Sequence, residues 1–125
     1  MNLNQVTIPS LDVEKAAGFY KTLGLKLIVE ALPRYVRFEC PDGNATFSIH
    51  KVDALPMAKG TSIYFEDDNL DELVSQLKQK GITFTSEAED KDWLWREAHL
   101  DDLDGNHIIL FKAGKNRKNP PWRVK

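Results

Sequence analysis

Three histidines and Glu97 carry the side chains best suited to chemistry in this sequence. His99 and His107 flank an Asp-Gly step, Glu97 stands two residues before His99, and His50 lies far upstream. Histidine exchanges a proton close to neutral pH, and residues two positions apart on a strand point to the same face. Glu97 and His99 are therefore candidates for the base or acid of a proton-transfer reaction.

The same side chains could hold a divalent metal, with His99, His107 and Glu97 as donors and His50 nearby on an earlier strand. Their spacing is not that of a recognised metal motif. Scattered histidines are more often hydrogen-bonded or exposed than ligating. Ordinary structural histidines are therefore favoured over a relocated His-His-Glu metal site.

Arg37 and several aromatic residues could contact a ligand directly. A guanidinium pairs bidentately with a carboxylate or phosphate, so Arg37 is a candidate anion anchor. Aromatic rings stack on flat or apolar ligands. The rings in question are those of Tyr35, Tyr64, Trp95 and Phe111. The alternative for Arg37 is an internal ion pair with Glu97, since buried charges are regularly paired.

An internal repeat supplies the elements that must position these residues. Residues 5–9 align with residues 62–66 at an offset of 57, and the alignment continues without a gap to residues 23–25 over 80–82. Each copy then carries apolar residues at i, i+3, i+4 and i+7, the pattern of an amphipathic helix. These stripes are Val13, Ala16, Ala17 and Tyr20 in the first copy and Leu70, Leu73, Val74 and Leu77 in the second.

The predicted helices have start and stop signals. Asp12 is the expected N-cap of the first helix and Gly24 its stop. Asp68 or Asn69 caps the second helix and Gly81 is its C-cap.

After its helix, each copy continues with three β-type runs. They cover residues 26–31, 35–40 and 45–51, then 83–86, 93–100 and 107–111. An Asp-Gly turn precedes the last run of each copy, and five extra residues in the second copy are assigned to the loop 87–92. The unit is therefore βαβββ, used twice as module 3–52 and module 60–112, with a polar tail at 113–125.

Strand alternation separates a helix-covered apolar face from the opposite face. The opposite face mixes polar and aromatic residues. It carries more aromatic side chains than a solvent-exposed face usually does, which fits a small-molecule site. The residues we assign to this site are Gln5, Arg37, Ser48, His50, Ser62, Tyr64, Trp95, Glu97, His99, His107, Ile109 and Phe111.

Composition narrows the class of protein. Hydrophobic residues make up 42% of the 125 residues and charged residues 29%, as expected of one globular domain, 1–125. A net charge of −2 gives no reason to bind nucleic acid, and no apolar run approaches a membrane span. The N-terminus lacks the pattern of a signal peptide, and the single cysteine, Cys40, agrees with a reducing compartment. We expect a cytoplasmic protein with neither nucleic-acid nor membrane partners.

The paired βαβββ units resemble the vicinal oxygen chelate superfamily, which includes glyoxalase I, bleomycin-resistance proteins and extradiol dioxygenases. Residues 3–112 carry the resemblance, most clearly in Gln5-Val6-Thr7-Ile8, in the segment 19–25, and in Asp104-Gly105-Asn106 with the strand that follows. The resemblance implies an α+β fold in which the two modules form a U-shaped sheet around one cavity. It also implies association into homodimers.

Many members of this superfamily hold a divalent metal on the first and last strands of each unit. The matching positions here are Gln5, Ser48, Ser62 and Ile109. Serine hydroxyls are poor ligands for zinc or iron, and isoleucine has no donor atom. We therefore expect no metal at the usual site and no cofactor, which also argues against iron-dependent extradiol dioxygenase chemistry.

Three functions remain open. The favoured one is a glyoxalase/bleomycin-resistance-like protein that binds a small organic molecule without the usual metal. The second is a lyase or isomerase of the glyoxalase type that uses Glu97 or His99 on a small carbonyl compound. The third is an interaction module with a vestigial pocket, suggested by Trp122 beside two prolines in the tail.

Overall fold

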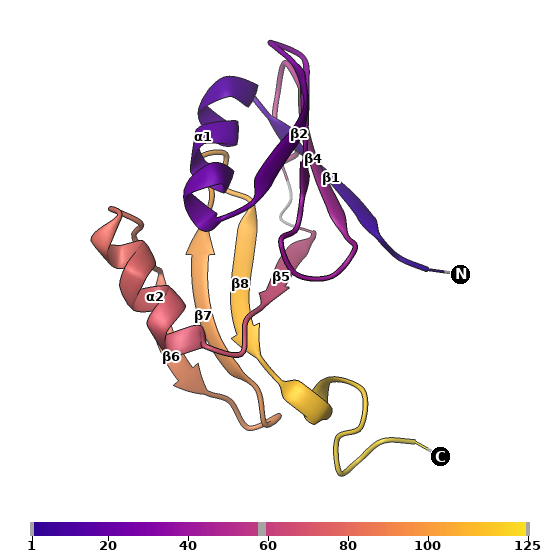
Figure 1. Ribbon diagram of the computed structural model, residues 1–125, viewed down its shortest axis with the longest axis vertical. Helices are drawn as coiled ribbons and strands as arrows, with labels where there is room; N and C mark the ends of the chain where they lie inside the picture. Colours follow the sequence, from indigo (N-terminus) through magenta and orange to yellow (C-terminus); the bar gives the residue numbers. More distant parts are fainter. Residues whose placement is uncertain (1, 58–59, 125) are drawn as a thin grey trace. The chain divides into compact units, whose positions relative to one another are not determined.

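The computed structural model describes residues 2–57 and 60–124 and divides into two compact units (Figure 1). Within these residues, unit 1 comprises 2–57 and 102–106, and unit 2 comprises 60–101 and 107–124. Each unit contains one helix and one four-stranded sheet. This confirms the α+β fold and the two βαβββ modules. The assignment of both modules to one domain, 1–125, and the cavity shared between them stay predictions.

Unit 1 begins with strand β1 (Gln5–Ser10) and helix α1 (Val13–Leu23). Strands β2 (Lys26–Ala31), β3 (Tyr35–Glu39) and β4 (Thr46–Lys51) follow. The sheet order is β1-β4-β3-β2, with β1 parallel to β4 and the other neighbours antiparallel. The first and last strands of the module are therefore neighbours, with β1 at the edge of the sheet.

Unit 2 repeats this arrangement with β5 (Ser62–Glu66), α2 (Leu70–Gln79), β6 (Ser86–Asp90), β7 (Arg96–Asp101) and β8 (His107–Lys112). The order is β5-β8-β7-β6, and β5 and β8 are parallel. A short 3-10 helix, Gly114–Arg117, follows β8. No helix among the described residues is long and apolar enough to span a membrane.

One strand prediction is wrong. The run expected at residues 83–86 is a strand at Ser86–Asp90, so most of the expected loop 87–92 is the edge strand β6. Its sequence of alternating acidic residues has low β-propensity, but pairing with β7 overrides that local preference. The connecting turn consequently lies at 91–95, and Trp95 precedes β7 rather than belonging to it.

Burial confirms most of the predicted apolar face. Tyr20, Phe38 and Phe47 pack together in unit 1, and the rings of Tyr20 and Phe47 lie 4.6 Å apart. In unit 2, Leu70, Val74 and Leu77 of α2 are buried above the sheet, whereas Leu73 is only half-buried. Leu73 therefore stands at the margin of the stripe.

The helix caps follow the sequence signals in part. Asp12 caps α1 and accepts a hydrogen bond from Lys15 N at 3.2 Å, and Gly24 ends the helix with φ of 106°. Asn69 precedes α2 without a side-chain capping bond. Lys80 is the C-cap of α2, and Gly81 follows it with φ of 92°, a left-handed conformation that favours glycine.

A buried carboxylate closes the turn 102–106. Asp102 is 7% exposed, and its Oδ1 accepts hydrogen bonds from the backbone N–H groups of Asp104 and Asn106. Its Oδ2 accepts from the Tyr20 hydroxyl at 2.7 Å and from the Asn106 amide at 2.8 Å. Four donors compensate the cost of removing this carboxylate from water.

The α2 stripe gives a stability prediction. Leu77→Ala should lower the free energy of unfolding by about 2–5 kcal/mol, because it leaves a cavity under the helix. Leu73→Ala is the matched control and should cost clearly less, since Leu73 is half-buried. Urea unfolding followed by circular dichroism measures both, and equal costs would contradict the packing described here.

Tyr20 gives a pH prediction. Burial, and next the charge of Asp102, raise the pKa of Tyr20 far above its ordinary value. The folded protein therefore holds this proton more tightly than the unfolded chain, in which tyrosine ionises at about pH 10. The resulting stabilisation is complete below about pH 10 and is lost as the pH rises further.

Between about pH 9 and about pH 11, the unfolding free energy should fall by about 1 kcal/mol more in the wild type than in Tyr20→Phe. Tyr64→Phe removes an exposed phenol outside the core and is measured alongside as the control. The same slope in Tyr20→Phe and in the wild type would show that Tyr20 does not cause the effect.

Candidate functional site

Strand register brings most of the predicted unit 2 residues to one face of its sheet. Glu97 on β7 lies opposite Phe111 on β8, and His99 lies opposite Ile109. Tyr64 on β5 pairs with Ile109 from the other side. Because side chains alternate along each strand, these residues lie on the face opposite α2, which we call the site face.

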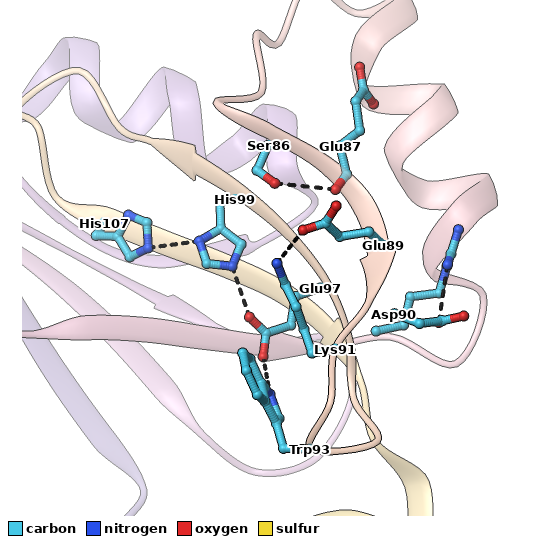
Figure 2. Close-up of polar contacts among 10 residues, drawn as sticks. Ser86, Glu87, Glu89, Asp90, Lys91, Trp93, Glu97, His99 and His107 are labelled. Atoms are coloured by element: carbon cyan, nitrogen blue, oxygen red, sulfur yellow. Dashed lines mark hydrogen bonds and ion pairs between the residues drawn. The ribbon is translucent and has the colours of Figure 1, made fainter.

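Glu97 is the buried anchor of the site face. It is 2% exposed, and its carboxylate lies between an indole and an imidazole (Figure 2). Trp93 Nε1 donates to Oε2 at 2.7 Å, and His99 Nε2 lies 2.8 Å from Oε1. Both carboxylate oxygens therefore have a partner, as a buried charge requires.

The chain of contacts continues through the second histidine. His99 Nδ1 lies 3.1 Å from His107 Nε2, and His107 Nδ1 lies 3.4 Å from Asp101 Oδ1. We call His99 and His107 the histidine pair. Carboxylate, two imidazoles and carboxylate thus form one connected row along β7 and β8, with Glu97 at its buried end. Such a row can hold and move protons between its members.

A lysine from the turn after β6 lies over this row. Lys91 forms an ion pair with Glu89, and its side chain is only 21% exposed. The hydrogen bond from Lys91 to Glu89 is the main cause that raises the pKa of Lys91, and the negative charges of Glu89 and Glu97 raise it further. The same bond lowers the pKa of Glu89. Lys91 therefore stays cationic beside Glu97.

The turn 91–95 positions these groups. Lys91 N donates to Trp95 O at 2.8 Å and Leu94 N to Lys91 O at 3.0 Å, which closes the turn. Leu94 has φ of 67°, a left-handed conformation that is unusual for a residue with a branched side chain. The turn carries Lys91 and Trp93 towards Glu97.

Sequence reasoning missed Lys91, Trp93 and Asp101 as site residues. Lys91 was hidden because the strand before it was expected too early, whereas Trp93 had a usable signal, since it stands in the expected run 93–100 on the same face as Glu97. Asp101 had a usable signal, since it stands two residues after His99 on the same strand.

Three rings, which we call the aromatic cluster, lie next to Glu97: Tyr64, Trp95 and Phe111. The rings of Trp95 and Phe111 are stacked with centroids 4.8 Å apart and planes at 21°. Tyr64 meets both rings edge-on, at 6.0 Å from Trp95 and 5.5 Å from Phe111. Phe111 is buried and Tyr64 is half-exposed, so the cluster offers an accessible ring above an apolar base.

The start of the tail packs beside this cluster. Glu66 Oε2 accepts from Ala113 N at 2.8 Å and from Gly114 N at 3.0 Å, and Arg117 pairs with its other oxygen at 3.6 Å. Trp95 Nε1 donates to Asn116 O at 3.3 Å. The segment 113–117 is therefore part of unit 2, whereas Trp122 further along is exposed.

The corresponding face of unit 1 carries a polar network of hydroxyls, an amide and one guanidinium. Ser48 is fully buried and accepts from Gln5 Nε2 at 2.9 Å, and its hydroxyl lies 2.6 Å from the Tyr35 hydroxyl. Arg37 Nε donates to that Tyr35 oxygen at 2.9 Å. Thr46 donates to the Gln5 carbonyl. Arg37 itself is exposed, so its guanidinium can reach a ligand.

The remaining predicted residues lie at more open positions. His50 is exposed at the end of the same row of β4, and Ser62 is exposed opposite His107. The contacts of Arg37 and Glu97 described above lie within their own units. An ion pair between them would join the two units and stays a prediction.

The residues at the usual metal positions do not fit a metal. The Gln5 amide is already bonded to Ser48 and Thr46, Ser62 offers only a hydroxyl, and Ile109 is a buried hydrocarbon. Across residues 2–57 and 60–124, no three His, Cys, Asp or Glu side chains converge as a metal site with three protein ligands would require. The donor set therefore gives no reason to route chemistry through a metal there.

A separate groove of about 290 Å³ lies on unit 2 between α2 and β6, lined by residues such as Asp71, Lys78, Glu87 and Arg96. Arg96 pairs with Asp71 at 2.9 Å, and Lys78 pairs with Glu87. Arg96 also donates to Asp90, and these contacts raise its pKa. The charged groups of the groove are thus paired with one another, so a charged ligand would have to break these ion pairs.

The family comparison agrees with this architecture. The model of the Glyoxalase/Bleomycin resistance protein/Dioxygenase superfamily matches residues 2–110. The chain belongs to this superfamily. No curated protein matches the sequence.

Solved structures show the same fold. The chain is 24% identical to a bleomycin-binding protein complexed with bleomycin, with a TM-score of 0.73 over 90% of this chain and 98% of that one. It is 16% identical to lactoylglutathione lyase from Agrobacterium tumefaciens, with a TM-score of 0.75 over 89% and 92%. A superfamily member from Sphaerobacter thermophilus is 27% identical, with a TM-score of 0.73 over 90% and 97%.

Proposed function

We propose that the site face of unit 2 binds a small organic molecule with a flat apolar part. The observation that carries this proposal is the aromatic cluster beside the buried carboxylate of Glu97. Ligand sites combine apolar surface with a few well-placed polar groups, and here the polar groups are Glu97, the histidine pair and Lys91. The similarity to a bleomycin-binding structure supports the binding role.

The polar groups of the site face are held in place before any ligand arrives. Glu97 is fixed by Trp93 and His99, and Lys91 by Glu89. Fixed groups reduce the ordering cost of binding. We further propose that the protein is a cytoplasmic homodimer and that Arg37 of unit 1 serves as a carboxylate anchor.

Binding is tested with two probes, bleomycin and the fluorescent dye 1-anilinonaphthalene-8-sulfonate. Trp95→Leu should weaken binding of the preferred probe by about 3- to 10-fold, because it removes one stacking ring while keeping an apolar side chain. Trp122→Leu removes an exposed tryptophan of the tail and should leave affinity unchanged. Fluorescence titration gives the affinities. Failure of both probes to bind, or equal affinity in both variants, would count against this surface.

Proton-transfer catalysis is a second candidate, favoured by the row Glu97–His99–His107–Asp101. In this role Glu97 or His99 takes a proton from carbon next to the carbonyl of a small substrate, and the histidine pair carries it towards Asp101. Lys91 provides positive charge near the position where an enolate oxygen would develop. This would be a lyase or isomerase reaction of the glyoxalase type.

Deuterium exchange into a panel of small α-hydroxycarbonyl and α-dicarbonyl compounds, followed by NMR, tests this candidate. Glu97→Gln should lower the exchange rate by about 10²- to 10⁴-fold, since the amide keeps the shape but is not a base. Glu87→Gln alters an acid of the groove on the other side of the sheet and should exchange like the wild type. An undiminished rate in folded Glu97→Gln would exclude Glu97 as the base.

A further inference from the structure

The two inner nitrogens of the histidine pair, His99 Nδ1 and His107 Nε2, face one another. Each neutral imidazole carries one N–H. When Glu97 and Asp101 act as acceptors, those hydrogens lie on the outer nitrogens, His99 Nε2 and His107 Nδ1. Two lone pairs then meet across the 3.1 Å between His99 Nδ1 and His107 Nε2. In that tautomer of both rings, a positive centre between them, either an additional proton or a metal ion, offsets the repulsion of the two lone pairs.

The ring geometry favours a shared centre beside both rings over a straight hydrogen bond. Two imidazoles in line with this nitrogen separation would have ring centroids about 5.4 Å apart. Two imidazoles that converge on one ion with bonds of about 2.0–2.1 Å would have centroids about 4.8 Å apart and subtend about 100° at the ion. The observed centroid distance is 5.0 Å, with the planes at 56°.

The outer contacts are those of metal-ligating histidines. Such histidines usually donate their second ring N–H to a carboxylate, which fixes the tautomer and the ring orientation. Glu97 does this for His99 at 2.8 Å, and Asp101 faces the outer nitrogen of His107 at 3.4 Å. Glu97 is itself held by Trp93, so the orientation of His99 is fixed from the buried side.

Charge and access also fit a divalent ion. The carboxylates of Glu97 and Asp101 offset a charge of +2, and the neighbouring Lys91 is paired with Glu89. The side chains of His99 and His107 are 23% and 28% exposed, so an ion can reach them from solvent. With only two protein donors, the other coordination positions stay open to water or to a ligand.

We propose that His99 Nδ1 and His107 Nε2 bind one divalent transition metal ion, with Glu97 and Asp101 orienting the two rings. Imidazole donors select zinc, cobalt, nickel or copper over magnesium and calcium. The site lies within unit 2 and uses neither Ser62 nor Ile109 as a donor.

The test is titration of tag-free, chelator-treated protein with Zn²⁺ by calorimetry and with Co²⁺ by visible absorption. The wild type should bind one equivalent of each. His99→Gln and His107→Gln should abolish this metal binding, and Glu97→Gln should weaken the metal affinity by about 10- to 100-fold. His50→Gln is the matched control, because it removes the remaining histidine and leaves the pair intact. Absence of binding to the wild type, wild-type affinity in both pair variants, or equal loss in His50→Gln would overturn the proposal.

A second measurement avoids the folding of variants altogether. Long-range ¹H–¹⁵N spectra of the unmutated protein resolve the ring nitrogens of all three histidines. One equivalent of Zn²⁺ should shift His99 Nδ1 and His107 Nε2 most and leave both nitrogens of His50 in place. Shifts centred on His50 or on the outer nitrogens, or the absence of any shift, would overturn the proposal.

Discussion

The last hairpin of the chain depends on the hydrogen bonds that the buried carboxylate of Asp102 accepts. A buried carboxylate is tolerated only with several donors, and here two backbone N–H groups, the Tyr20 hydroxyl and the Asn106 amide supply them. These bonds define the turn 102–106, in which Gly105 has φ of 79°. The turn joins β7 to β8, whose register pairs Asp101 with His107 and His99 with Ile109. The histidine pair lies on the two strands that this turn joins.

Within unit 2, Glu97 is likewise a buried carboxylate that hydrogen-bond donors must satisfy. Its burial would be prohibitive without Trp93 and His99, and its position on a central strand leaves those partners little freedom. Among the described residues, no buried side-chain nitrogen or oxygen lacks a hydrogen-bond partner. A fully satisfied polar network is rigid, and rigidity keeps the rings and charges of the site face in a fixed arrangement.

The two modules share one plan but differ in the chemistry of their open faces. Both place the first and last strands together and cover the other side of the sheet with a helix. Unit 1 fills its open face with hydroxyls and an amide around Ser48. Unit 2 uses carboxylates, imidazoles and aromatic rings instead. The two modules therefore share an apolar core under the helix, where packing constrains the side chains, and differ in the side chains on the opposite face of the sheet.

The sequence by itself determined the modules, the helix stripes and which residues share a sheet face, because these follow from local periodicity and from the alignment of the two copies. Val74 and Leu77 of α2 are buried as expected, and Glu97 and His99 share the predicted face. Only the tertiary structure decided where β6 lies, since the acidic segment Ser86–Asp90 becomes a strand by pairing with β7. It also decided that Trp93 and Lys91 lie near Glu97 and that the two histidines meet through their inner nitrogens. Such distances depend on strand register and on a turn with a left-handed leucine, and neither leaves a periodic signal in the chain.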